Sequence, residues 1–221
     1  MPAYFTTELF RFLAGLKRNN NRDWFRAHQN KYETHVRQPV LQFISDFAAP
    51  LYEITPYLVA DARPSRGSMF RIYRDTRFSS DKRPYKTHVA MRFSHQGKDV
   101  HSPGFYLHLE SGACFAASGL WHPEPPTLLK VRSAIVSRPD EWRAVHRLLN
   151  WDDASRLSRP PRGFPADHEF VEDLKLRDLG TAVELTDKQI CSPRFMSVFA
   201  TACRKMSPVA AFLSSAVGLK F

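Results

Sequence analysis

The sequence contains little cysteine. Its three cysteines, Cys114, Cys191 and Cys203, lie far apart and show no CxxC spacing. An odd number of scattered cysteines excludes a disulfide framework and a zinc knuckle, because both need paired or closely spaced thiols. We therefore expect three free thiols that pack as small apolar residues in or near the core, in a reducing compartment.

Long apolar runs are also missing. No window of this sequence approaches the roughly 20 apolar residues that a membrane span requires, and no basic stretch leads into an apolar run near residue 1. The sequence thus predicts neither a membrane span nor an export signal. Together with the free thiols, this pattern predicts a cytoplasmic protein.

The chain lacks the common signatures of catalysis and of nucleic-acid recognition. It holds no GxSxG, no Gly-rich phosphate loop and no HExxH. Helix-turn-helix, RNP and zinc-finger patterns are absent as well, so any nucleic-acid binding is expected to tolerate many base sequences. On these grounds we predict no cofactor.

The composition is that of an ordinary globular protein. Of the 221 residues, 43% are hydrophobic and 24% are charged, a balance that excludes general disorder. Because we find no repeat, low-complexity tract or boundary, we predict a single domain over residues 1–221. Lys and Arg number 32 against 22 Asp and Glu, a net charge of +10 that should attract anions. No oligomeric state is predicted.

Apolar residues recur at helical spacing in several segments. Trp24 leads one series and is expected to be buried against the sheet or the first helix, whereas His28 on the same stripe is predicted to be a hydrogen-bonded structural histidine. Pro39 should kink or split its helix, and Pro208 should interrupt the last one. The predicted helices cover residues 6–17, 24–40, 125–136, 140–150, 169–176 and 192–217.

Alternating apolar and polar residues predict strands over residues 68–74, 85–93, 105–110 and 113–120, with a further extended segment over 181–185. The first four are joined by connections too short for crossover helices, so the strands should run antiparallel. The predicted fold class is therefore α+β, with an antiparallel sheet of about four or more strands flanked by N-terminal and C-terminal helices.

The segment over residues 71–88, RIYRDTRFSSDKRPYKTH, is strongly basic: it holds six basic residues and only two acidic ones, Asp75 and Asp81. On a β-hairpin these side chains are expected to converge, a geometry suited to bidentate contact with phosphate or carboxylate. The alternative is that Asp75 and Asp81 pair with neighbouring arginines and merely stiffen an exposed loop. The candidate ligand-binding residues are Arg71, Tyr73, Arg74, Arg77, Lys82, Lys86 and, on the following strand, Arg92.

Strand alternation also predicts a polar face on the sheet. If Phe70, Ile72 and the apolar residues of the next strands face the core, a set of polar side chains gathers on the other side: Arg71, Tyr73, Lys86, His88, Arg92, Tyr106, His108 and Glu110. A solvated face without a function is the alternative. His88, His108 and Glu110 are the candidate catalytic residues. These three side chains would also suit zinc or iron, but the surrounding Arg and Lys oppose a cation, so no metal is predicted.

Four stretches resemble a known family. The run over 71–88, NNNRDWF near the start, FYLHLESGACFAASGLWHP and LTDKQICSPRF are similar to an uncharacterised family of bacteria and fungi, domain of unknown function two-four-six-one. The resemblance covers essentially the whole chain. It implies one continuous domain in a bacterial cytosol, and it assigns no catalytic residue.

Three functions from different classes follow from these patterns. The first is binding of a phosphorylated or otherwise anionic ligand, including nucleic acid, at the basic hairpin; Tyr73, Phe78 and Tyr85 are placed to stack on bases. The second is a small hydrolase or transferase in which His88 or His108 performs acid–base chemistry on an anionic substrate. The third is a protein–protein interaction domain.

Overall fold

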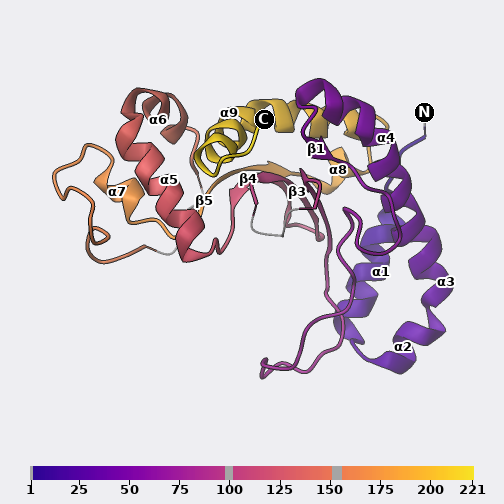
Figure 1. Cartoon of the computed structure of the whole chain (residues 1–221). Coiled ribbons are helices and arrows are strands. Elements are labelled where there is room, and N and C mark those ends of the chain that lie inside the picture. Colours follow the sequence, from indigo (N-terminus) through magenta and orange to yellow (C-terminus); the bar gives the residue numbers. More distant parts are fainter. Residues whose placement is uncertain (1, 98–101, 151–155) are drawn as a thin grey trace.

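The computed structural model describes residues 2–97, 102–150 and 156–221. Within these ranges the fold is a five-stranded sheet flanked by helices from both ends of the chain, which confirms the predicted α+β class (Figure 1). The strands lie in the order β1-β2-β3-β4-β5, and each pairs antiparallel with its neighbour. Their bounds are β1 Leu58–Val59, β2 Val89–His95, β3 Gly104–Leu109, β4 Cys114–Leu120 and β5 Leu179–Leu185.

The N-terminal helical region contains more breaks than predicted. The helix breaks at His28, and at Pro39 the chain stays helical but changes from a π-helical turn to an α-helix that begins one residue before the proline, so the expected irregularity at Pro39 is present. At the break, the His28 Nδ1 lies 2.8 Å from the Trp24 carbonyl oxygen, so the ring occupies a backbone acceptor. The elements are α1 Thr7–Arg18, α2 Arg22–Ala27, α3 Gln29–Tyr32, the π-helical turn η1 Glu33–Arg37 and α4 Gln38–Ile54.

Trp24 packs against the first helix, as expected, although it is half-buried rather than fully buried. A Cβ atom on Gly15 would lie 3.0 Å from the Trp24 ring, so the indole rests directly on the α1 backbone. On its other side the ring stacks on His28, with centroids 4.0 Å apart and planes at 14°. His28 is thus the hydrogen-bonded structural histidine that was predicted.

The C-terminal half supplies the helix that covers the sheet. Helix α9 runs through Pro208 without interruption, contrary to expectation, because buried residues on both sides of it, such as Met206 and Leu213, outweigh one lost backbone hydrogen bond. The C-terminal helices are α5 Pro125–Ser137, α6 Pro139–His146, α7 Val171–Leu174, α8 Asp187–Ile190 and α9 Phe195–Ala216. Within the described ranges, no helix is both long and apolar enough to cross a membrane.

The core consists of two hydrophobic clusters. The larger joins α1–α4 to the sheet and to the first half of α9, with Phe47, Phe93 and Phe199 in mutual contact. The smaller joins α5, α6 and α7 to the end of α9, where Trp142 packs on Phe212. Helix α9 therefore contributes side chains to both clusters.

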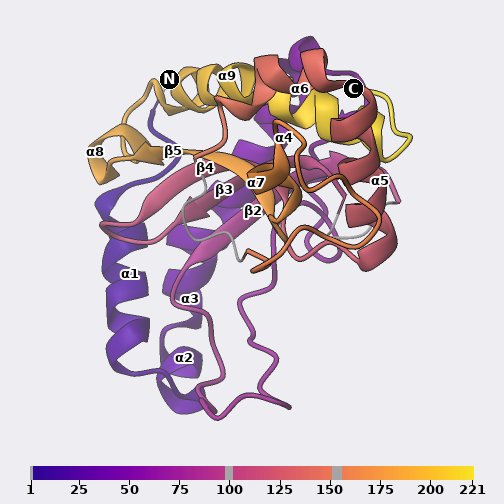
Figure 2. The ribbon, with the colours of Figure 1, turned by 90° about the vertical axis from the view of Figure 1, so that its left-hand side faces the viewer.

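The two faces of the sheet differ in what covers them. Met91, Leu107 and Ala116 lie opposite one another across β2, β3 and β4, and all are buried on the face beneath α9. Arg92, Tyr106 and Ala117 share the next row of the register and point to the other face. Figures 1 and 2 show α9 on one side of the sheet, and no helix of the described residues lies across the strands on the other. We call this second side the open face.

The predicted basic hairpin is not a regular hairpin. Residues 68–74 and 85–88 form only the isolated bridges Met69↔Met91 and Tyr73↔Tyr85, because the chain bends at Ile72 and again before β2. The bend changes the alternation, so Ile72 is buried as predicted, whereas Phe70 lies against Tyr106 on the open face, contrary to prediction. Residues 71–88, which we call the arm, project away from α9 in both views (Figures 1 and 2).

A few specific contacts hold the arm against the N-terminal helices. The Asn20 side chain bonds both backbone groups of Tyr85, donating to the carbonyl oxygen at 2.9 Å and accepting from the N–H at 3.0 Å. The Tyr85 ring stacks on Phe25 with centroids 4.3 Å apart. The NNNRDWF segment and the basic segment are therefore partners in space.

Candidate functional site

A cavity of about 450 Å³ lies on the open face, and we call it the sheet cavity. Its walls are mainly apolar and aromatic, and a few polar groups, among them two histidines, enter from the strands. Such a mixture is typical of small-molecule sites. The lining residues are Phe70, His88, Arg92, Gly104, Phe105, Tyr106, His108, Phe115, Ala117, Ser118, Gly119 and Trp121.

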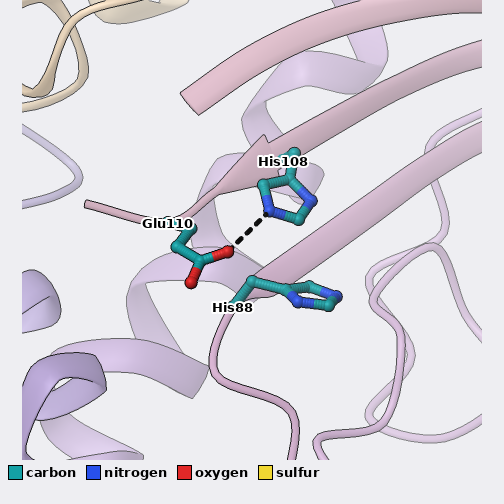
Figure 3. A group of neighbouring side chains, drawn as sticks. All are labelled: His88, His108 and Glu110. Atoms are coloured by element: carbon teal, nitrogen blue, oxygen red, sulfur yellow. Dashed lines mark ion pairs between the residues drawn. The ribbon is translucent and has the colours of Figure 1, made fainter. Parts of the chain in front are cut away.

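The predicted catalytic candidates lie in one cluster (Figure 3), and two of them, His88 and His108, line this cavity. His88 directly precedes β2, His108 lies in β3, and Glu110 follows the last residue of β3. The imidazole centroids of His88 and His108 are 4.4 Å apart, and His108 Nε2 lies 3.5 Å from Glu110 Oε2. The sequence prediction that these three side chains lie together is thus confirmed.

Neighbouring side chains hold the cluster in position. The Tyr106 hydroxyl lies 3.0 Å from His108 Nδ1, on the side of the ring opposite Glu110. The Phe115 ring stacks on His108 with centroids 4.8 Å apart and planes at 10°. Thr87 Oγ1 and Lys17 Nζ donate to Glu110 Oε1 at 3.5 and 3.4 Å, which leaves Oε2 directed at His108.

Burial alters the pKa values of these groups. It lowers the pKa of His88 to about 4, helped by the nearby charges of His108 and Lys86 and opposed by Glu110. It also lowers the pKa of His108, although the contact with Glu110 opposes this change. Burial raises the pKa of Tyr106 to about 12. At pH 7 the site therefore presents two neutral imidazoles, each with one nitrogen lone pair.

Most arginines of the arm are bound to its own aspartates. Asp81 pairs with Arg74 at 2.5 Å and with Arg83 at 2.7 Å, and the two guanidinium groups hold its pKa well below the usual range. Arg77 pairs with Asp75 at 2.7 Å and lowers the pKa of that carboxyl to about 2. For Arg74, Arg77 and Arg83, the structure therefore agrees with the alternative in which Asp75 and Asp81 pair with neighbouring arginines.

The basic candidates do not converge on one point. Arg74 and Lys86 line a hollow of about 210 Å³ between the arm and α1, together with Lys17 and His88; we call it the arm hollow. Arg71 instead lines a separate hollow of about 600 Å³ beside β1. Because side chains alternate along an extended chain, the arm sends its basic groups to both of its sides.

The remaining candidates lie elsewhere. Arg92 lines both the hollow beside β1 and the sheet cavity. Tyr73 packs on Tyr85, with ring centroids 5.3 Å apart, and stays 53% exposed. Lys82 donates to the Thr76 carbonyl oxygen within the arm at 3.0 Å.

Several site residues were missed by the sequence analysis. Phe115 and Gly119 line the cavity from β4, and the same alternation that placed Tyr106 and His108 would have placed them on the open face. Lys17 had no such signal, because its contact with Glu110 joins residues 93 positions apart.

The fold and the site define an α+β protein with a ligand-sized cavity on the open face of an antiparallel sheet. A family model described as conserved hypothetical protein (DUF2461) matches residues 8–212. The chain belongs to this family, as its resemblance in the arm and in the neighbouring segments implied. Searches of curated proteins and of solved structures each found no match.

Proposed function

We propose that this protein binds a small organic molecule that carries an anionic group, such as a phosphate or a carboxylate. The apolar body of the molecule occupies the sheet cavity, and its anionic group lies beside Lys86. The aromatic walls supplied by Phe70, Phe115 and Trp121 support the first part of this proposal.

The surroundings of Lys86 support the proposed position of the anionic group. Its side chain is half-buried, and its Nζ lies 5.3 Å from the centroid of Phe70, a wall of the sheet cavity. Among the described residues, no carboxylate lies within 4.0 Å of this ammonium group, although Asp81 lines the same hollow. Burial and the charge of Arg71 lower the pKa of Lys86. The charged form of this side chain is therefore destabilised, and a bound anion would offset that destabilisation.

Small ligands fit this arrangement better than nucleic acid does. A polyanion would need several basic side chains on one surface. Here Arg74, Arg77 and Arg83 are already paired with aspartates, and Lys86 lies recessed in the arm hollow.

A second candidate is a hydrolase or transferase that acts on the same ligand. His88 lines both the sheet cavity and the arm hollow, so a group bound at Lys86 would lie beside an imidazole. This position favours the acid–base roles expected for His88 and His108.

We also propose a cytoplasmic location and a single working domain. Cys114, Cys191 and Cys203 are all free, which suits a reducing compartment. Helix α9 contributes to both hydrophobic clusters, which favours one domain over two.

Thermal unfolding with phenyl phosphate, inorganic phosphate and phenol tests the binding proposal. Phenyl phosphate should raise the Tm most, because it alone fills both the cavity and the anion position. At 100 times its Kd a ligand adds about 2.7 kcal/mol, or roughly 5–10 °C for a chain of this size.

Lys86→Met should abolish the extra effect of phenyl phosphate, whereas Lys82→Met, in the same arm, should keep it. The Tm of unliganded Lys86→Met should not fall, because the substitution removes a half-buried charge without a carboxylate partner. Equal responses of the two variants, or equal responses to phenyl phosphate and phosphate, would refute the proposal.

A further inference from the structure

The cluster of His88, His108 and Glu110 beside the sheet cavity consists of residue types that commonly bind metal ions. One ligand atom each from His88, His108 and Glu110 can be chosen so that all three lie within 4.8 Å of one another. Two imidazoles and one carboxylate form the protein ligand set of many catalytic zinc and non-haem iron centres. We propose that these three residues bind one divalent transition-metal ion, in preference Zn²⁺, beside the sheet cavity.

The spacing of the ligands fits the size of the ion. Two ligand atoms at about 2.1 Å from a tetrahedral zinc lie about 3.4 Å apart. His108 Nε2 and Glu110 Oε2 are 3.5 Å apart, which matches this spacing. The His88 ring points away from Glu110 (Figure 3), but one of its nitrogens lies within 4.8 Å of both other ligand atoms, so a rotation of this side chain completes the set.

The groups around the ligands are those that a metal site needs. The ring of a metal-bound histidine donates its second N–H to an oxygen, which fixes its orientation. For His108 this oxygen is the Tyr106 hydroxyl, 3.0 Å from Nδ1, and the tautomer with hydrogen on Nδ1 directs the Nε2 lone pair toward Glu110. Thr87 holds the other carboxylate oxygen at 3.5 Å.

The site also keeps a position open for a substrate. Three protein ligands leave the fourth tetrahedral position for water or for a ligand atom. Both histidines line the sheet cavity, so this position faces the space of about 450 Å³. A zinc ion with two neutral imidazoles and one carboxylate carries a net charge of about +1, which favours the anionic ligand proposed above.

Two lysines oppose the ion, and this provides a sharp test. Lys17 Nζ lies 3.4 Å from Glu110 Oε1 and competes with a cation for the carboxylate charge. Lys86 places a second positive charge near His88. If the site binds a metal, removing the Lys17 charge should tighten binding, whereas a purely structural cluster would be indifferent.

The metal site is a property beyond the proposed ligand binding, and it is incompatible with acid–base catalysis by His88 and His108. An imidazole whose lone pair is bound to the ion cannot also accept a substrate proton. A metal centre would therefore replace the acid–base roles of His88 and His108 with activation of a bound water or polarisation of the ligand.

The experiment uses the full chain without an affinity tag, stripped with EDTA and dialysed. Calorimetric titration with Zn²⁺ and the visible spectrum with Co²⁺ should each show one ion per chain, and the cobalt spectrum should be that of a four-coordinate site. Glu110→Gln and His108→Ala should weaken binding by at least about tenfold. Lys17→Met should strengthen it, and His35→Ala, outside the cluster, should leave it unchanged.

Absence of stoichiometric binding at micromolar protein would overturn the proposal, as would binding that is insensitive to both Glu110→Gln and His108→Ala. Far-UV circular dichroism confirms that each variant folds, and Glu110→Gln keeps the test valid should His108→Ala fail to fold. The phenyl phosphate experiment, run on the stripped protein, separates a failure of the metal site from a failure of ligand binding.

Discussion

Replacing Trp24 with alanine tests how the N-terminal helices are held together. The indole rests on the α1 backbone at Gly15, stacks on His28 at 4.0 Å and lies 5.7 Å from the ring of Phe12. Its removal deletes these contacts and leaves a gap between α1 and α2 that rigid helices cannot fill. We therefore expect a clear loss of stability although Trp24 does not line the sheet cavity.

The size of the loss follows from the burial of the ring. A fully buried Trp or Phe replaced by Ala costs about 3–5 kcal/mol. Trp24 is only half-buried, so we expect about 2–3 kcal/mol, or a fall in Tm of roughly 5–10 °C for a chain of this size. Urea unfolding followed by far-UV circular dichroism measures it, because the helical signal does not depend on the deleted fluorophore.

The exposed Tyr52 supplies the matched control. Its side chain is 70% exposed, so Tyr52→Ala should change the free energy of unfolding by less than about 0.5 kcal/mol. A loss below about 1 kcal/mol for Trp24→Ala would mean that the indole does not bind α1 to α2, and the packing described for this region would be wrong.

Two further predictions concern a glycine in the cavity wall and the thiols. Gly119→Ala should destabilise the protein by about 2–4 kcal/mol, because Gly119 has φ 154° and a Cβ would lie 2.3 Å from the Leu179 carbonyl oxygen. Gly112→Ala, where a Cβ meets open space, should cost no more than about 1 kcal/mol in the same urea assay, and equal losses would contradict this account. Burial raises the pKa of Cys114 to about 12 and raises that of Cys203, so both remain thiols at pH 8 and should react with an aromatic disulfide reagent only after unfolding. Rapid reaction of all three thiols in the native protein would show that the core is not closed.

The alternation of apolar and polar residues predicted which side chains of the strands share a face of the sheet. Side chains alternate strictly along β2 and β3, so Arg92, Tyr106 and His108 were placed correctly on one face before any pairing was known. The same reasoning failed for Phe70, because Met69 rather than Phe70 pairs with the core-facing Met91, and the bend at Ile72 then returns the alternation to the predicted one. The position of the arm was also not predicted, because it is held by bonds between Asn20 and Tyr85, which are 65 residues apart and leave no periodic signal.

The sequence likewise predicted one part of the candidate site and missed another. The cluster of His88, His108 and Glu110 follows from strand register, and it was predicted. The distribution of the basic residues was not, because it depends on which arginine each aspartate binds. Charge density alone could not distinguish the paired Arg77 from Lys86, which has no carboxylate within ion-pair distance among the described residues.

Helix α9 has a consequence for how the chain folds during its synthesis. The helix follows all five strands in chain order, yet it covers the buried face that Leu107 and Ala116 present. A ribosome adds about 5–20 residues per second, so this face waits on the order of several seconds after β4 has emerged. During that interval the strands expose apolar surface and an unpaired edge, and the nascent chain is open to capture by chaperones or by its neighbours. Native closure of this face therefore waits until α9 has been made, and a message truncated before Phe195 should yield an insoluble product.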